Sequence, residues 1–428
     1  MNTWNRTALL GFVGFAGLAG CAGAGMAPNP DGAGFSALPS LRSGGAPLHQ
    51  AKPLTSSGNS PQSIYVFEGQ PDGGTPDAGV INNGNTLYGT TYQGGTNNLG
   101  TVFSVTTGGS EQILHSFAAT DGAKPQGSLL DVKGTLYGTA SAGANSVDTY
   151  GNVFSITPSG SFKVVYAFKE SPDGAFPASS LIEYKGALYG TTEDGGTVGY
   201  GTVFKIQLKG KSAGQESVIY SFKGGPGSGP DGAVPKSALV HVGNAFYGTT
   251  YSGGANGGGT VFKVTESGTE TVLHSFAGTC SAATDGTEPT GGLLYYKGTF
   301  YGTTYCGGAN GQGTTFSITK AGKEKVLDSF YITTKAPYVG VHPMAPLTNI
   351  GGTIYGTTTG SWPEGSGIVF TMTPSGTLTT VGVFCRGTAQ GCPETPWSDP
   401  IEVGNTLYGT SVGNGGSHGL GTVWALAP

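Results

Sequence analysis

The sequence predicts an all-β protein, a seven-bladed β-propeller built of four-stranded antiparallel blades. Three observations support this prediction. The tripeptide Tyr-Gly-Thr begins at positions 88, 137, 189, 247, 301, 355 and 408 of a 428-residue chain. Each repeat contains four short runs rich in Val, Ile, Leu, Tyr, Phe and Thr, bounded by turn residues. The last repeat lacks its fourth run, and a matching run stands before the first repeat.

The N-terminus has the layout of a bacterial lipoprotein signal peptide over residues 1–20. Arg6 precedes the apolar stretch ALLGFVGFAGLAG, and Leu-Ala-Gly-Cys, which ends at Cys21, resembles a lipobox. The resemblance implies cleavage before Cys21 and lipid on its sulfur; an ordinary signal peptide cut nearby is the alternative. Residues 21–61, rich in Gly, Ala, Pro and Ser, then form a flexible tether. We expect the bacterial cell envelope as the location, with a lipid anchor in the outer membrane or at the cell surface.

The repeat unit that starts at residue 127 illustrates the four predicted strands. Its runs are GSLLDVKG, TLYGTAS, GNVFSITPSG and SFKVVYAF. After the signal peptide, no segment keeps an apolar i, i+3, i+4 pattern over three turns. Four strands in about 50 residues, repeated seven times, are typical of a propeller, and a β-solenoid with shorter coils ranks second.

The two ends of residues 62–428 predict how the ring closes. The stretch SIYVFEG at 63–69 matches fourth strands such as SVIYSFKG, whereas the final GTVWALAP matches a third strand. Pairing of 63–67 with 421–427 would complete the seventh blade. Closure removes two strand edges that would otherwise be open to aggregation.

We interpret Tyr-Gly-Thr as scaffolding in the second strand of each blade. Glycine lets a neighbouring ring approach closely, tyrosine fills the gap between blades, and threonine suits the pleat. Seven identical roles indicate packing, because a catalytic group is needed only once.

The whole unit, LYGTT..GG.....GTVF.....G....L..F, resembles the GloVer tandem repeat of exported bacterial proteins, which is kelch-like in its period. The resemblance extends over residues 63–428. It implies export, a surface anchor and a propeller, and it implies no particular activity.

Five units are preceded by Asp-Gly followed by proline, with the aspartates at Asp72, Asp121, Asp173, Asp231 and Asp285. A ring of cation-binding carboxylates is one interpretation. We favour a local turn, because calcium needs six to eight oxygens and each loop offers one carboxylate. Asparagine should then replace aspartate at little cost. We also expect no metal, because no His-x-His or His-Glu pair suggests zinc. We expect no cofactor, because the glycine-rich loops join two strands and lack the lysine of a phosphate-binding loop.

Histidines and cysteines are few. His115 and His274 stand in fourth strands where other blades have tyrosine, and we expect them to pack between blades or face solvent. An exported chain favours disulfides, and the loops that enter a blade share a face with those after its second strand. Cys280 and Cys306 lie in these two loops of blade five, and Cys385 and Cys392 bracket RGTAQG within the loop that enters blade seven. We therefore predict two bonds, Cys280–Cys306 and Cys385–Cys392.

Blades six and seven depart from the repeat and are the predicted place for a ligand. Trp362 and Glu364 replace the Gly-Gly loop of blade six, and Trp397 and Asp399 lie at the entry to blade seven. Exposed tryptophan beside carboxylates suits sugar stacking or protein contact. The alternative is that both tryptophans cover the closure seam.

A net charge of −5 without a basic stripe argues against nucleic acid as a partner. We favour a monomeric, membrane-anchored module that binds a glycan or protein ligand. The alternative is a propeller enzyme such as a glycan hydrolase, lyase or lactonase. No catalytic residue is assigned, because the Gly-x-Ser-x-Gly and Asp-box motifs are both absent. Three or more acids, histidines or arginines converging at the central channel would favour the enzyme.

Overall fold

The computed structural model describes residues 60–143, 150–169, 171–224, 231–277, 279–281, 284–332, 340–360, 367–384, 393–413 and 419–427. All of them belong to one compact unit, residues 48–428. Within these ranges, no helix has the length and apolar character needed to cross a bilayer. The signal peptide, Cys21, Trp362, Glu364, Cys385 and Cys392 lie outside the described residues.

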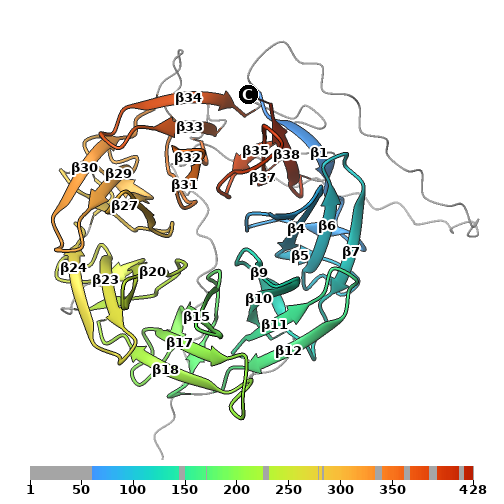
Figure 1. Cartoon of the computed structure of the whole chain (residues 1–428). Coiled ribbons are helices and arrows are strands. Elements are labelled where there is room, and N and C mark those ends of the chain that lie inside the picture. Colours follow the sequence, from blue (N-terminus) through green and yellow to red (C-terminus); the bar gives the residue numbers. More distant parts are fainter. Residues whose placement is uncertain are drawn as a thin grey trace, which may run out of the picture. The chain divides into compact units, whose positions relative to one another are not determined.

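Seven antiparallel sheets are arranged around a ring (Figure 1), which confirms the predicted propeller. The first strand of each blade lies nearest the axis and the fourth lies outermost. Blades 1 to 4 are β3 (Ile81–Asn83), β4 (Thr86–Thr91), β6 (Thr101–Thr106), β7 (Glu111–Ser116); β9 (Leu130–Val132), β10 (Thr135–Ala142), β11 (Asn152–Ile156), β12 (Phe162–Ala167); β14 (Ile182–Tyr184), β15 (Ala187–Thr192), β17 (Thr202–Gln207), β18 (Glu216–Ser221); and β20 (Val240–Val242), β21 (Ala245–Thr250), β23 (Thr260–Thr265), β24 (Glu270–Ser275). Blades 5 to 7 are β26 (Leu294–Tyr296), β27 (Thr299–Thr304), β29 (Thr314–Ile318), β30 (Glu324–Ser329); β31 (Thr348–Ile350), β32 (Thr353–Thr358), β33 (Ile368–Met372), β34 (Leu378–Val383); and β36 (Ile401–Val403), β37 (Thr406–Gly413), β38 (Thr422–Leu426), β1 (Gln62–Val66).

Short strand pairs join the loop that enters a blade to the loop after that blade's second strand. They are β2 (Gly73–Gly74) with β5 (Gln93–Gly94), β13 (Gly174–Ala175) with β16 (Asp194–Gly195), β19 (Gly232–Ala233) with β22 (Ser252–Gly253), and β25 (Gly286–Thr287) with β28 (Cys306–Gly307). In blades 2 and 7, β8 (Ala123–Pro125) and β35 (Glu394–Pro396) pair directly with the long second strands. These two loop types therefore share one face of the ring, which we call the loop face.

The N-terminal strand completes the last blade, as predicted. β1 pairs antiparallel with β38, with Gln62 opposite Ala425 and Val66 opposite Thr422. Phe67, just beyond β1, is buried with Val80 and Phe103 of blade 1. The closing strand is thus held by both its own blade and the next one.

The glycine of Tyr-Gly-Thr lies against an aromatic ring of the third strand. A Cβ placed on Gly89 would lie 2.6 Å from Cζ of Phe103, and one on Gly190 would lie 2.7 Å from Cζ of Phe204. Only glycine fits at such distances. The tyrosines face the following blade, as where the Tyr189 ring stacks on Phe246 at 4.3 Å between centroids. Both roles agree with the scaffolding interpretation.

The threonine has a stronger role than its fit to the pleat. Its hydroxyl donates a hydrogen bond to a buried carbonyl at the entry to the following blade. This bond occurs at six junctions: Thr139 to Ser179, Thr191 to Ser237, Thr249 to Gly291, Thr303 to Ala345, Thr357 to Ser398 and Thr410 to Ala78. At the seventh junction, Thr90 Oγ1 is buried without a hydrogen-bond partner in the described part of the chain. The repeated tripeptide therefore links neighbouring blades by hydrogen bonds as well as by packing.

Candidate functional site

Aspartates of the Asp-Gly turns pair with the end of the preceding fourth strand. Asp173 Oδ2 accepts hydrogen bonds from the Tyr166 hydroxyl at 2.8 Å and from the Lys169 amide at 2.9 Å. Its Oδ1 accepts from the Gly174 amide at 2.7 Å. Tyr65–Asp72 and Tyr220–Asp231 repeat this arrangement. Local backbone donors satisfy the carboxylates, which supports the turn interpretation.

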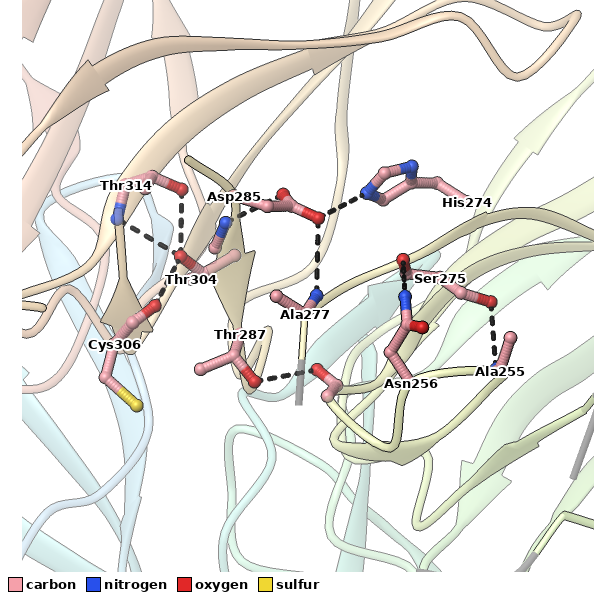
Figure 2. Close-up of polar contacts among 12 residues, drawn as sticks. Ala255, Asn256, His274, Ser275, Ala277, Asp285, Thr287, Thr304, Cys306 and Thr314 are labelled. Carbon is pink, nitrogen blue, oxygen red and sulfur yellow. Dashed lines mark hydrogen bonds and ion pairs between the residues drawn. The ribbon is translucent and has the colours of Figure 1, made fainter. Parts of the chain in front are cut away.

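Histidine replaces tyrosine at two of these junctions. His115 Nε2 lies 3.2 Å from Asp121 Oδ2, and His274 Nε2 lies 3.1 Å from Asp285 Oδ2. Figure 2 shows His274 and the backbone amide of Ala277 directed at the same carboxylate oxygen of Asp285. His115 also stacks on a phenylalanine ring of the next blade. These histidines are therefore packed between blades, as expected, and are also paired with an acid, which the sequence did not predict.

A glutamate from the following blade lies beside four of these pairs. Its Oε1 is buried and has no hydrogen-bond partner among the described residues, at Glu111, Glu216, Glu270 and Glu324. Burial, and next the nearby aspartate charge, raise the pKa of Glu111 and Glu270 to about 7 and that of Glu216 to about 8. Burial also raises the pKa of Glu324 to about 7, and neighbouring His274 opposes this rise. Beside the fifth pair, His115–Asp121, the corresponding residue is Phe162.

One of these junctions opens into a shallow cleft. Between β1 and β7, a cleft of about 450 Å³ is lined by Tyr65, Asp72, Thr96, Glu111 and Ser116, among others. Glu111 is thus one wall of a cleft that is open to solvent.

The residue before the proline of each entry loop has a left-handed backbone. Its φ lies between 50° and 57° at Thr75, Lys124, Phe176, Val234, Glu288, His342 and Thr395. This conformation is strained for β-branched residues such as Val234. Hydrogen bonds stabilise it, because the Val234 amide donates to the Tyr200 carbonyl at 3.1 Å and its carbonyl accepts from the Tyr251 amide at 3.0 Å. Seven copies indicate a structural frame, at which the side chain is free to vary.

Three positions of the repeat place variable side chains in an arc on the loop face of blades 3 to 6. They are the residue before the entry-loop proline, the residue after it, and the residue that follows the second strand. We call it the loop-face arc; it comprises Glu193, Lys236, Tyr251, Glu288, Tyr305 and His342. Lys236 Nζ lies 3.8 Å from Glu193 Oε1 and 4.8 Å from the centre of the Tyr251 ring. The rings of Tyr305 and His342 are 4.7 Å apart. All six side chains are half-buried, so each is both held and accessible.

The electrostatics of the loop-face arc follow from this partial burial. Burial, and next the charge of Glu288, raise the pKa of both Tyr251 and Tyr305. Burial raises the pKa of Glu193 against the opposing effect of Lys236. Burial lowers the pKa of His342, whose Nδ1 has no hydrogen-bond partner in the described ranges. The arc therefore presents neutral tyrosine hydroxyls and hydrogen-bonding groups next to aromatic rings.

The predicted Cys280–Cys306 disulfide is confirmed, with the two Cα atoms 5.0 Å apart. It joins the loop that enters blade 5 to the strand that follows β27. Cys306 Sγ also lies 3.6 Å from Glu288 Oε2, so the bond adjoins the loop-face arc. The Cys385–Cys392 bond lies outside the described residues and stays a prediction.

Of the four predicted ligand residues, Trp397 and Asp399 are described. Both are half-buried at the entry to blade 7. A Cβ on Gly79 would lie 3.2 Å from both Asp399 Oδ1 and Ser128 Oγ, so this acid lies where blades 7, 1 and 2 meet. Burial raises the pKa of Asp399 to about 6. Trp362 and Glu364 lie outside the described residues, so the four-residue rim stays a prediction.

The loop-face arc was missed from the sequence, although a signal was present. The residue before the entry-loop proline and the residue after the second strand vary strongly, while the frame around them is constant. Variation at fixed positions of a repeat indicates that packing does not determine these side chains, which leaves them available to contact a ligand.

The fold and the repeated junctions define this protein as a seven-bladed propeller of tandem repeats. The sequence matches the Gloeobacter/Verrucomicrobia repeat family over residues 53–241 and again over 186–424. The chain belongs to this family, which confirms the resemblance noted in its sequence. The lipoprotein signal stays a prediction.

Solved structures share the fold at low identity. The computationally designed Ika8 protein is 13% identical, with 86% of this chain and 100% of that chain covered and a TM-score of 0.46. An ancestral GH74 enzyme is 11% identical, with 87% and 48% covered and a TM-score of 0.51. A gluconolactonase from Xanthomonas campestris is 12% identical, with 89% and 99% covered and a TM-score of 0.39. No curated protein matches the sequence. Such likeness concerns the fold alone.

Proposed function

We propose that this protein is a lipid-anchored module of the bacterial cell envelope whose loop-face arc binds a glycan. The observation that carries this proposal is the row of half-buried tyrosines, Tyr251 and Tyr305, flanked by hydrogen-bonding side chains. A sugar ring stacks its C–H face on an aromatic ring and needs hydrogen bonds for its hydroxyls. Glu193, Glu288 and Lys236 supply acceptors and a donor beside those rings.

Binding isotherms with a panel of soluble oligosaccharides test this proposal. Y251A and Y305A should each weaken binding by about tenfold or more, as expected when a central aromatic contact is lost. Y184A is the matched control, because Tyr184 lies at the β14–β15 turn, at the other end of a blade. Equal weakening by all three variants would contradict a site on the loop face, and binding of protein but not of oligosaccharides would indicate a protein ligand.

The enzyme alternative has one specific observation in its favour. Glu193 and Glu288 lie on the same arc, and burial raises the pKa of Glu193, as suits a general acid. The same oligosaccharides, incubated with the protein and assayed for new reducing ends, separate the two functions. If E193Q and E288Q abolish product formation while binding persists, the arc is catalytic; without product from the unmutated protein, it is a binding site.

The anchor is tested separately. We expect the mature chain to begin at Cys21 and to carry lipid there. Mass spectrometry of the N-terminal peptide, and release of C21A from the membrane fraction, would establish it. An unmodified N-terminus elsewhere would show that an ordinary signal peptide is used.

A further inference from the structure

The five Tyr/His–Asp pairs differ in one respect that bears on metal binding. Three pairs contain tyrosine, whose neutral hydroxyl is a poor ligand. The His115–Asp121 pair contains histidine, but Phe162 stands where the other pairs have glutamate. Among the five, only the junction of blades 4 and 5 brings together a histidine, an aspartate and a glutamate: His274, Asp285 and Glu324.

The geometry of this junction suits a shared cation. One ligand atom from each of the three side chains lies within 4.8 Å of the other two. His274 Nε2 and Asp285 Oδ2 are 3.1 Å apart, close to the roughly 3.3 Å that separates two ligands about 2 Å from a tetrahedral zinc ion. Glu324 Oε1 is buried and has no hydrogen-bond partner among the described residues. Three other junctions share such an oxygen, but of the five junctions only this one places a histidine beside it.

The three ligands come from three separate elements that the fold holds in place. His274 is on β24, Asp285 is in the Asp-Gly turn, and Glu324 begins β30. The amides of Ala277 and Gly286 hold the Asp285 carboxylate. The His274 and Asp285 side chains keep 22% and 23% of their surface exposed, so an ion reaches them from solvent.

We propose that His274, Asp285 and Glu324 bind one divalent transition-metal ion of the zinc class. One imidazole nitrogen and two carboxylate oxygens are a borderline ligand set that favours zinc, cobalt or manganese over calcium. Solvent completes the coordination. The ion is an addition to the turn and does not replace it, because the aspartate keeps its backbone donors.

Titration calorimetry of the purified protein with Zn²⁺ alone tests this site, and Co²⁺ absorption serves as a spectroscopic readout. The unmutated protein should bind one more equivalent of zinc than H274Y does. This variant recreates the tyrosine–aspartate pairs found elsewhere in the ring. E324Q should weaken that binding by about tenfold or more. H115Y is the control, because it removes the other Asp-paired histidine, which lacks the glutamate, and should leave the stoichiometry unchanged.

A gain of function makes the test independent of the loss variants. Y220H places histidine beside Asp231 and Glu270, which recreates the proposed ligand set at another junction. This variant should bind one further equivalent of zinc. Unchanged stoichiometry in both H274Y and Y220H, or an equal loss in H115Y and H274Y, would overturn the proposal. If H274Y fails to fold, the Y220H result decides alone.

Discussion

The hydroxyl of Thr410 donates a 2.7 Å hydrogen bond to the carbonyl of Ala78, a residue 332 positions earlier in the chain. This bond crosses the junction where the ring closes. It is the same bond that links five other junctions of the ring, so closure uses the ordinary interface between blades. A non-local junction of this kind forms only when the two ends of the domain are both folded.

Removing that hydroxyl should cost stability. T410V keeps the volume but leaves the buried Ala78 carbonyl without its donor, and we expect a loss of about 1–3 kcal/mol in the free energy of unfolding. The matched control is T90V, because Thr90 Oγ1 is buried without a partner among the described residues. T90V should be neutral or stabilising. Urea denaturation of both variants measures the difference, and equal effects would show that the hydrogen bond contributes nothing.

The glycine of Tyr-Gly-Thr should tolerate no side chain. A Cβ on Gly248 would lie 2.7 Å from Cζ of Phe262, whose ring is fully buried. We expect G248A to lower the unfolding free energy by about 1–3 kcal/mol, the usual cost of overpacking. Gly108 is the control, because it is exposed and its Cβ would meet only Thr106 Oγ1 at 3.8 Å. If G248A and G108A have the same melting temperature, the close approach of Gly248 to the Phe262 ring does not contribute to stability.

Much of the fold was predictable because the same strand pattern recurs in every repeat, so an uncertain assignment in one repeat is supported by the others. A single TLYGTAS run is uncertain as a strand, whereas seven copies at a regular period indicate one architecture. Closure by residues 63–67 followed from counting strands in the last unit. The hydrogen bond from Thr410 was not predictable, because it depends on how far neighbouring blades are rotated, and the sequence period carries no such information.

The candidate site was predictable only in part. Cys280 and Cys306 were paired correctly, because topology places their loops on one face. The Tyr166–Asp173 type of pair was missed, since tyrosine on a fourth strand also suits packing and nothing local distinguishes the two roles. Both partners are absent together at the entry to blade 6, where Asp328 stands at the tyrosine position. Covariation of this kind, within one chain, is the signal to use in other repeat proteins.

The turn aspartates should tolerate asparagine less well than the sequence predicts. Asp173 accepts hydrogen bonds on both carboxylate oxygens, from Tyr166, Lys169 and Gly174. The NH₂ group of asparagine donates and cannot accept, so D173N leaves at least one donor unpaired. We expect D173N to lose about 1–3 kcal/mol, close to D173A.

Denaturation of D173N and D173A, each with and without EDTA, measures this effect. Y166F provides the double-mutant cycle, because it removes one donor at the same carboxylate. If D173N is as stable as the unmutated protein, the original turn interpretation is correct, and a single accepting oxygen at this position is enough.

The disulfide should stabilise the loop that enters blade 5. Its two cysteines are 26 positions apart, and the chain-entropy estimate for such a loop is roughly 3.5 kcal/mol. C280S combined with C306S should therefore lower the unfolding free energy by up to about that amount. Reductant should reproduce the shift in the unmutated protein and leave the double variant less affected. Identical melts with and without reductant would indicate that the bond contributes nothing to stability.

Stability should fall as the pH rises towards mildly alkaline values. Glu216 has an ordinary pKa of 4.5, which burial and then the charge of Asp173 raise to about 8 in the folded protein. The folded state therefore holds a proton that the unfolded state releases. A raised folded pKa means that the stabilisation is fully present below pH 4.5 and is lost as the pH rises through about 8. Glu111 and Glu270, with pKa values raised to about 7, act in the same direction.

E216Q isolates this effect, because glutamine matches the protonated side chain and never ionises. The variant should equal the unmutated protein at acidic pH and exceed it in unfolding free energy at mildly alkaline pH. Urea denaturation across that pH range measures how the free energy of unfolding changes with pH. EDTA is present to remove metal from the junction of blades 4 and 5. Adding E111Q and E270Q should flatten the curve further, since the three glutamates lie at separate junctions. Parallel curves for all variants would show that these carboxylates ionise in the folded ring without cost.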